Sequence, residues 1–433
     1  MRETDPRMAF TKGIGSPIFP PMIEAIEERT EGRGRFLRTT TGVAVAVALA
    51  HGLNDAYAAF LHPLLPRIMD RLGLSIALAA VLTTTLSLAA SLLQPVMGYL
   101  SDRYDRRLFI IAGPLFSCVF MSLIGVAPSF GVLAILLALG GLGSAAFHPP
   151  GASMAARVAE GKGSGLRLSL FSFGGSAGYA LGPLLAVGIV SLVGLEGLWV
   201  AMIPPVLVLC LLYVLLPGDR EHAAAAPPSP RAVMAALAGP LGLLFGISAI
   251  STFVQRVFQT MQPIAVAAAG GSEALGALSL SAYFVGQAAG SLAGGWLTDR
   301  MDRRRIFVML TLISLPAHLL ALWLPPGSAF GLLAAVLAGC ATMALLPPIV
   351  ISAQEMLPFG TAVGSGIVMG AAWAAGSLGV LGTGVLGDLV GARGAALLST
   401  PVILAATALA LRPALKGLGN SAADAAAVSI EGR

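Results

Sequence analysis

Long apolar segments, separated by short charged or Pro/Gly-rich stretches, follow one another from about residue 40 to residue 412. A helix rises about 1.5 Å per residue, so roughly 20 apolar residues cross the hydrocarbon core of a bilayer. Breaking the pattern at its polar interruptions predicts twelve membrane-spanning helices. Their expected bounds are 40–65, 74–99, 108–127, 131–157, 166–193, 196–216, 234–262, 273–298, 306–324, 329–356, 361–389 and 393–412.

A polar stretch in the middle of the chain divides these helices into two sets of six. It runs from Pro217 to Arg231 and contains four consecutive Ala followed by three Pro, which is typical of a linker. The tail ends in Ile-Glu-Gly-Arg, which resembles the protease site of an expression tag. We therefore expect a cytoplasmic N-terminal segment, a first bundle, a cytoplasmic linker, a second bundle and a cytoplasmic tail with a tag remnant, at residues 1–37, 38–216, 217–233, 234–413 and 414–433.

A charged ten-residue motif occurs once in each half. The sequence GYLSDRYDRR begins at Gly98 and GWLTDRMDRR begins at Gly295, so seven of ten positions are identical and the copies start 197 residues apart. Each copy lies between two apolar segments and is expected to form a hairpin in water. Two copies at equivalent positions indicate an internal duplication, a common feature of transporters.

This motif carries a resemblance to a known family. The pattern Gly-x-Leu-x-Asp-Arg-x-x-Arg-Arg is similar to the loop between spans 2 and 3 of the major facilitator superfamily, and to its echo between spans 8 and 9. Asp105 and Asp302 stand where the family usually has Gly, and Asp tolerates turn conformations well. The resemblance implies an all-α membrane protein of two pseudo-symmetric six-helix bundles, which alternates between inward-open and outward-open states around a midplane site.

Composition and charge agree with a membrane protein. Hydrophobic residues make up 56% of the chain and charged residues 11%, whereas soluble domains have about 25% charged residues. The net charge of +5 lies in the loops, so it indicates orientation and not a nucleic-acid partner. The three cysteines lie far apart in apolar runs, without the spacing of a disulfide framework or a metal site.

The distribution of Lys and Arg predicts the orientation. With the N-terminus inside, seventeen of these cations lie near the inner ends of the spans, and only Arg67, Arg71 and Arg393 lie near the outer ends. Nothing at the front of the chain resembles a signal peptide. We expect a multi-pass, monomeric protein of the plasma (inner) membrane, with both termini cytoplasmic and the lipid bilayer as its surroundings.

Further motifs resemble particular branches of the superfamily. In span 5, Gly174–Pro183 resembles the Gly-(seven residues)-Gly-Pro signature of drug/proton antiporters, although a small-residue packing face is the alternative interpretation. The stretches His51–Asp55, Leu64–Pro66 and Phe147–Gly151 resemble the fosmidomycin-resistance branch. These resemblances imply proton-coupled drug efflux.

Ionisable residues at membrane depth are the first candidates for function, because they are costly unless they face a cavity or a partner. Asp55 lies near the middle of span 1, and His51 is one helical turn before it on the same face. We predict that these two residues carry the coupling proton. A purely structural ion pair is the alternative.

Other polar residues are expected to line the substrate cavity. Arg256 lies in span 7, the counterpart of span 1, and the repeat offset places it one turn from Asp55, so an attraction between them is expected unless Arg256 extends to the membrane surface. His148 precedes Pro149-Pro150, and span 10 repeats this pair as Pro347-Pro348, which predicts a bend in each half. The predicted cavity residues are Asn54, Gln94, His148, Arg256, Gln259 and Gln287.

The repeated hairpins are expected to act as a conformational latch. The family resemblance places Asp102 and Asp299 against the starts of spans 11 and 5, near Thr361 and Ser164. Glu355, at the end of span 10, is expected to bind Arg300 or Arg303; the alternative is a solvated end cap. The predicted latch residues are Asp102, Arg103, Arg106, Asp299, Arg300, Arg303 and Glu355.

The sequence predicts neither a cofactor nor a metal, and no enzyme. Gly161-Lys-Gly-Ser164 lacks the spacing of an ATP-binding loop, and Gly382–Gly387 fits a dinucleotide fingerprint but lies inside an apolar span. The expected function is proton-coupled export of a small molecule, drug-like or anionic. A uniporter or a proton symporter with the same fold is the alternative, and a membrane enzyme or a non-transporting receptor is a third class.

Overall fold

The computed structural model describes residues 39–158, 164–218, 230–356 and 366–416, and every regular element in these ranges is a helix. The first six predicted spans correspond to six helical stretches in that part of the chain. Spans 1 and 2 each consist of two helices, separated by residues 59–60 in span 1 and by Leu93 in span 2. The helices are α2 (Thr40–Ala58), α3 (Leu61–Leu72), α4 (Ile76–Leu92), α5 (Gln94–Arg103), α6 (Arg106–Ser122) with η1 (Leu123–Val126), α7 (Phe130–Val158), α8 (Ser164–Val193), η2 (Glu196–Met202) and α9 (Ile203–Leu215).

The second half repeats this plan after the short helix α10 (Pro230–Leu237). The predicted start of span 7 at residue 234 is wrong, because residue 234 lies within α10 and the membrane helix starts at Pro240, after Gly239. Proline is well tolerated at a first helical position, since its missing amide hydrogen has no partner there anyway. The remaining helices are α11 (Pro240–Ala268), α12 (Glu273–Thr298), α13 (Arg303–Trp323), α14 (Ala329–Met343), α15 (Leu346–Met356), η3 (Gly366–Ala371), α17 (Ala372–Ser399), η4 (Thr400–Val402) and α18 (Ile403–Ala410).

The last two spans form one long helical stretch, Gly366–Ala410, with a sharp corner. At Gly391 the backbone has φ 78° and ψ 158°, a conformation that only glycine adopts readily. This corner lies between residues 389 and 393, where the sequence predicts the boundary between spans 11 and 12. The helices on the two sides of this corner are the predicted spans 11 and 12. With α12 as span 8, the described chain contains all twelve predicted spans.

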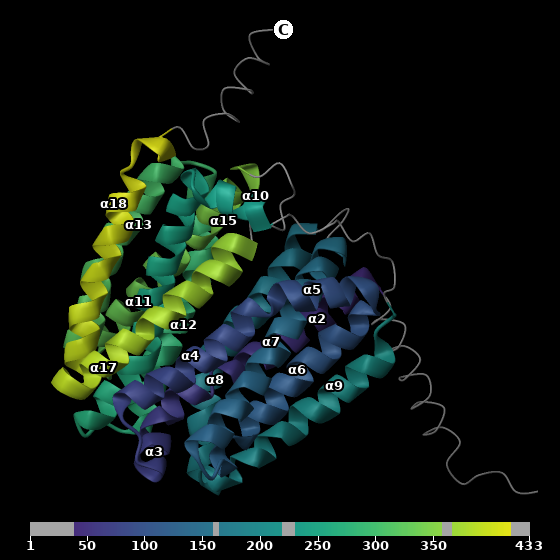
Figure 1. The fold of residues 1–433 in the computed structure, drawn as a ribbon. Coiled ribbons are helices and arrows are strands. Elements are labelled where there is room, and N and C mark those ends of the chain that lie inside the picture. The colour runs from purple at the N-terminus through teal and green to yellow at the C-terminus, as the bar shows by residue number, and fades with distance from the viewer. Residues whose placement is uncertain (1–38, 159–163, 219–229, 357–365, 417–433) are drawn as a thin grey trace, which may run out of the picture.

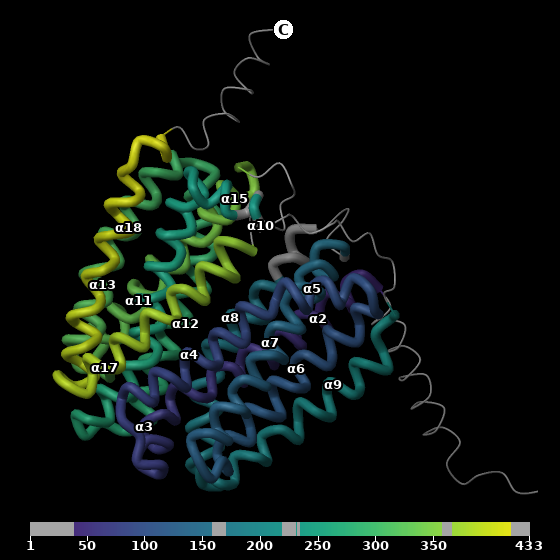
Figure 2. Tube along the Cα trace, in the orientation of Figure 1, coloured from purple at the N-terminus to yellow at the C-terminus, as the bar shows by residue number. Residues whose placement is uncertain are grey.

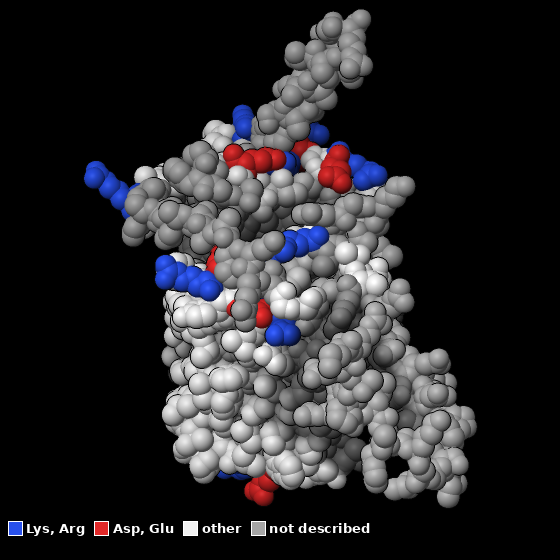
Figure 3. Space-filling model, turned by 90° about the vertical axis from the view of Figure 1, so that its right-hand side faces the viewer, with Lys and Arg blue, Asp and Glu red and all other residues white. Residues whose placement is uncertain are grey.

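The surface of these helices suits a bilayer. Ten stretches of the described chain are long and apolar enough to cross a membrane, and large apolar side chains such as Leu192, Leu389 and Val214 are more than three-quarters exposed. Charged side chains lie in the upper part and at the lower edge of the face in Figure 3, and a white band separates them. A soluble protein would bury such a band, so the chain is a multi-pass membrane protein.

The two halves form two bundles that meet along four helices. In Figures 1 and 2 the helices α2 and α5 to α9 form one bundle, and α11 to α15, α17 and α18 form the other. Helix α4 packs against α17, and α8 packs against α12. The bundles are closest near α3 and spread apart toward α5 and α15 (Figure 1).

Small residues bring α8 very close to α2. A Cβ atom on Gly174, Gly178 or Gly182 would lie only 2.2–2.3 Å from a backbone oxygen of α2. The four-residue spacing puts these glycines on one face of α8, so they allow close contact of the two helices. In this structure the glycines of the span 5 motif therefore have a packing role.

The two proline pairs have different surroundings. Helix α7 continues through Pro149-Pro150, whereas α14 ends at Met343 and α15 begins at Leu346, directly before Pro347-Pro348. A break in the helix therefore accompanies the double proline in the second bundle. In the first bundle the helix is continuous through the double proline, so a bend at Pro149-Pro150 stays a prediction.

Candidate transport site

A carboxylate and two imidazoles meet in the core of the first bundle. Asp55 and His51 lie on α2, with His51 Nε2 3.2 Å from Asp55 Oδ2. His148 comes from α7, and its Nε2 lies 3.6 Å from Asp55 Oδ1. Asp55 is only 3% exposed. We call these three residues the Asp-His-His cluster.

Backbone carbonyls orient both imidazoles in the same way. His51 Nδ1 lies 2.9 Å from the carbonyl oxygen of Phe171, and His148 Nδ1 lies 2.8 Å from that of Ser144. A carbonyl only accepts hydrogen bonds, so each Nδ1 carries a hydrogen. In the neutral form each Nε2 then has a lone pair that faces the carboxylate. The Asp-His-His cluster is therefore arranged to hold a cation between acceptors.

A buried network holds the carboxylate in place. The amide of Asn54 donates to Asp55 Oδ1 at 2.9 Å and to Ser144 Oγ at 3.2 Å, and Ser117 Oγ donates to Asn54 Oδ1 at 2.8 Å. Asn54 was predicted to line the cavity, but it is fully buried and orients Asp55 instead. Helices α2, α6 and α7 thus all contribute to the position of one carboxylate.

Helix α8 closes the cluster on its remaining side. The ring of Phe171 stacks on His51 with 4.2 Å between the centroids. A Cβ atom at Gly175 would lie 2.5 Å from His51 Nε2 and 2.8 Å from Asp55 Oδ2. Gly175 therefore leaves the space that these polar atoms occupy.

Arg256 lies in the second bundle and does not contact Asp55. Its Nη1 donates to Gln259 Oε1 at 2.8 Å, and no carboxylate of the described chain lies within 4.0 Å of its guanidinium. The expected attraction between Arg256 and Asp55 is therefore not a direct contact in this structure. Tyr179 on α8 packs against Phe284 of α12, with 5.2 Å between the centroids.

The predicted glutamines of the cavity bind nearby groups. Gln94 donates to the carbonyl oxygen of Ala90 in the preceding turn of its own span, and Gln287 donates to Gln255 at 2.8 Å, which links α12 to α11. Gln259 is almost fully buried beside Arg256. Only the last of these contacts involves a charged group.

Several polar residues of the contact between the bundles were not predicted. His62 on α3 is buried, and neither ring nitrogen has a hydrogen-bond partner. Arg67 and Glu273 form an ion pair between the bundles, 2.6 Å from Nε to Oε1. Asp388 accepts from the backbone amide of Ile76 at 2.7 Å. The sequence could have indicated His62, because a histidine is unusual inside an apolar span. Arg67, Glu273 and Asp388 lie near the ends of spans, where charged residues are common.

The contacts of the predicted latch residues lie within each bundle. Asp102 accepts from Arg106 at 2.7 Å, while Arg303 binds both carboxylate oxygens of Glu355, with 2.8 Å from Nη2 to Oε1. Arg103 and Arg300 stack on aromatic rings of their own helices, and Asp299 is exposed at the end of α12. The predicted partner region near Thr361 lies outside the described residues, as does the side chain of Ser164.

The same three polar groups are of the types that bind metal ions. Their ligand atoms lie within 4.8 Å of one another, although the sequence predicts no metal site. Spacing did not indicate this group because His148 is 93 residues from Asp55 in the chain. Both imidazoles and the carboxylate thus converge on one small volume.

Comparisons with known proteins agree on a family of transporters. The family model described as Major Facilitator Superfamily matches residues 47–253 and 243–428. The fosmidomycin resistance protein of Escherichia coli (strain K12) is 30% identical over 367 residues, which are 81% of this chain and 87% of that protein. An uncharacterised MFS-type transporter, YfnC of Bacillus subtilis (strain 168), is 27% identical over 82% of this chain and 88% of its own length.

Solved structures show the same fold. A bacterial homologue of the human lysosomal transporter Spinster superposes with a TM-score of 0.72 at 17% identity, and covers 85% of this chain and 95% of its own. A D-xylose–proton symporter gives a TM-score of 0.66 at 18% identity, with 86% and 98% covered. At these identities the likeness concerns the fold alone.

Proposed function

This chain belongs to the Major Facilitator Superfamily, and from that premise we propose that it exports a small molecule in exchange for protons by alternating access. The resemblance to the fosmidomycin-resistance branch, predicted from short motifs, is confirmed by the relative from E. coli. The name of that relative supports drug efflux as the direction of transport. The observation that carries the proton coupling is the Asp-His-His cluster.

The cluster alternates between a loaded and an empty form. In the loaded form His51 Nε2 carries a proton and donates a hydrogen bond to Asp55. This bond removes the repulsion between the nitrogen lone pair and the carboxylate. When the proton leaves, the carboxylate faces two lone pairs and its charge is uncompensated within the bundle. An uncompensated buried charge is costly, so proton release favours a rearrangement that supplies a new partner.

Arg256 provides a reason for coupling proton and substrate. Its guanidinium is partly buried and has no acidic partner in the described chain, so an anionic group on the substrate stabilises it. The same cation is able to approach the deprotonated Asp55 when the bundles move. Substrate and carboxylate then compete for one guanidinium, and binding of the substrate anion displaces Asp55 toward reprotonation.

The arrangement of the bundles supports an inward-facing state. Hydrogen bonds between the bundles, such as those of Asp388 and Glu273, lie at the ends of α4 and α12 far from the charged hairpins. With both termini and the hairpins on the cytoplasmic side, as the distribution of cations predicts, the outer side is closed.

Transport by reconstituted protein tests this proposal. Fosmidomycin flux into proteoliposomes is measured with and without a pH gradient, for the wild type and for Asp55→Asn. We expect the gradient to increase wild-type flux at least tenfold and to have no effect on the variant, because an amide lacks the negative charge that stabilises a proton on His51 Nε2. Asp70→Asn is the matched control, since Asp70 is exposed in the same span.

Three results would contradict the proposal. Gradient-driven flux that persists in Asp55→Asn excludes that carboxylate as the partner of the coupling proton. If wild-type flux requires a divalent metal and is lost when a chelator is added, the Asp-His-His cluster binds a metal ion and not the coupling proton. Flux that follows the substrate gradient alone in the wild type identifies a uniporter.

A further inference from the structure

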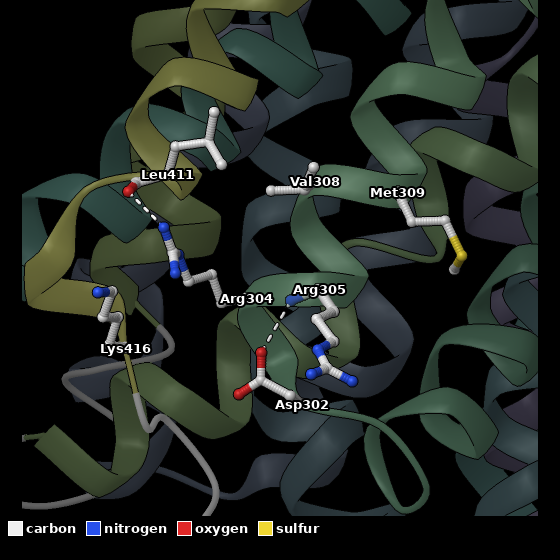
Figure 4. Close-up of a pocket in the computed structure, with 7 residues that line it drawn as sticks. All are labelled: Asp302, Arg304, Arg305, Val308, Met309, Leu411 and Lys416. Carbon is white, nitrogen blue, oxygen red and sulfur yellow. Dashed lines mark hydrogen bonds between the residues drawn. The ribbon is translucent and has the colours of Figure 1, made fainter.

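A pocket of about 630 Å³ lies beside the charged hairpin of the second bundle, far from the Asp-His-His cluster. Three cations and one acid line it, and Figure 4 shows them around the same space. Arg304 and Arg305 come from the first turn of α13, while Lys416 follows α18. With Asp302 as the acid, the formal charge of the lining is +2.

Two of these four groups already have structural roles. Arg304 donates to the carbonyl oxygens of Ala410 and Leu411 at 3.1 and 2.6 Å, and so caps the C-terminal end of α18. Asp302 accepts from the backbone amide of Arg305 at 3.0 Å, and so caps the N-terminal end of α13. The side chains of Arg305 and Lys416 form no ion pair with any carboxylate that the structure describes.

The first bundle shows that this surplus positive charge is not a requirement of the fold. Arg107, the counterpart of Arg304, donates to Leu216 at 3.1 Å and thus caps the end of α9 in the same way. The counterparts of Arg305 and Lys416, at repeat offsets of 197 in the hairpin and 198 after it, are Leu108 and Gly218. The duplicated fold therefore forms without these two cations, and their presence in the second bundle calls for another explanation.

The apolar part of the lining indicates the kind of ligand. Val308 and Met309 line the pocket less than two turns from the start of a membrane-spanning helix, and the third apolar residue, Leu411, is half exposed. The pocket thus joins a cationic mouth in water to an apolar wall in the membrane. Anionic phospholipids combine the same two features, and guanidinium groups match phosphate geometry well.

We propose that this pocket binds the phosphate headgroup of an anionic phospholipid on the hairpin side of the membrane. Arg305 and Lys416 bind the phosphate, and an acyl chain lies along the apolar wall. The lipid occupies a site at the ends of α13 and α18, so it links the charged hairpin to the last helix of the bundle.

Lipid binding to the purified full-length protein tests this. Native mass spectrometry measures the retention of phosphatidylglycerol and of zwitterionic phosphatidylcholine by the wild type, Arg305→Gln, Lys416→Gln and the double variant. We expect the wild type to prefer phosphatidylglycerol. Each single variant is expected to bind this lipid about fivefold more weakly, because one cation near a bilayer surface contributes about that factor. Arg412→Gln removes an exposed cation of the same face outside the pocket and is the matched control.

Three outcomes would overturn the proposal. Equal retention of the two lipids by the wild type excludes a headgroup site. An equal loss in Arg412→Gln shows general surface attraction instead of a site. Competition by inorganic phosphate at the concentrations at which phosphatidylglycerol binds shows that the ligand is a free phosphate. Arg305→Leu, which introduces the residue of the first bundle, provides a second variant compatible with the fold.

Discussion

At the scale of single residues, two backbone carbonyls decide the chemistry of the candidate site. Without the carbonyls of Phe171 and Ser144, each imidazole could donate a hydrogen from Nε2 to the carboxylate in its neutral form. With them, a bond between Nε2 and Asp55 requires an added proton. The two carbonyls thus leave Nε2 of each neutral imidazole as an acceptor, which is the basis of the proposed proton coupling.

A substitution at Gly175 tests whether transport depends on the positions of His51 and Asp55. Gly175→Ala places a methyl group against His51 Nε2 and Asp55 Oδ2, so one of them must move. We expect at least tenfold lower gradient-driven flux and a loss of about 1–3 kcal/mol in stability, the usual cost of overpacking. The measurements are proteoliposome flux and thermal unfolding in detergent.

Gly188→Ala is the control for this substitution. Gly188 lies on the same helix, and a Cβ atom there meets nothing within 4 Å. Both substitutions have the same effect on helix propensity, so a difference between them reports the local contact. Equal flux in the two variants would show that the cluster tolerates displacement.

At the scale of elements, the two hairpins share one contact and differ in another. Arg107 and Arg304 cap the last helices of their bundles in the same way. Their neighbours diverge: Arg106 binds Asp102 of its own hairpin, whereas its counterpart Arg303 binds Glu355 of α15. At the repeat offset of 198, the first bundle has Arg157 in place of Glu355, and a cation cannot accept from Arg106.

The pair of Arg303 and Glu355 is expected to stabilise the second hairpin. Glu355→Gln removes the charge that faces a guanidinium only 9% exposed, while the acid itself is 49% exposed. We expect a loss of about 1 kcal/mol, near the upper end for exposed pairs, because only one partner is buried. A double-mutant cycle with Arg303→Gln in detergent unfolding measures this coupling.

Arg300 provides the comparison for that cycle. It stacks on Trp296 and has no contact with Glu355, so the effects of Arg300→Gln and Glu355→Gln are expected to add. Additive effects for Arg303 as well would mean that the observed contact contributes nothing to stability.

At the scale of the whole molecule, the bundles are held together on one side. Arg67 pairs with Glu273, and the carboxylate of Asp388 caps the first amides of α4 from the opposite bundle, at 2.7 and 3.3 Å. Thr84 also donates to the carbonyl oxygen of Ser377 at 3.1 Å. An acid at a helix N-terminus stabilises the cap and interacts favourably with the helix dipole.

These links are expected to set the balance between the two states of the transporter. Asp388→Asn combined with Glu273→Gln removes the charge from two contacts, each worth about 1 kcal/mol, so the equilibrium shifts at least fivefold toward the outward-open state. Spin-label distances between α3 and α12 at the outer side measure the shift. We expect a longer distance to become populated.

Glu196→Gln is the control for charge on the same side. Glu196 is exposed and lies in the first bundle, in η2. A distance distribution that remains at its wild-type form in the double variant, or one that changes equally in Glu196→Gln, would show that the links between the bundles do not hold the outer side closed.

The sequence by itself determined the architecture. The number of spans follows from the length of apolar runs, and the two bundles follow from the repeat, since both properties are local along the chain. It also placed His51 and Asp55 on one face of one helix, because a spacing of four residues does so in any helix. The family resemblance rested on motifs that are contiguous in the chain, and the comparisons confirm it.

Only the tertiary structure decided which groups meet. It placed His148, not Arg256, beside Asp55, and it put Asn54 behind the carboxylate. The rotation of each helix and the distance between helices depend on packing such as that of Gly178 against α2, which no single segment encodes. Asp388 and Ile76 are 312 residues apart, so their contact exists only because the two bundles pack together.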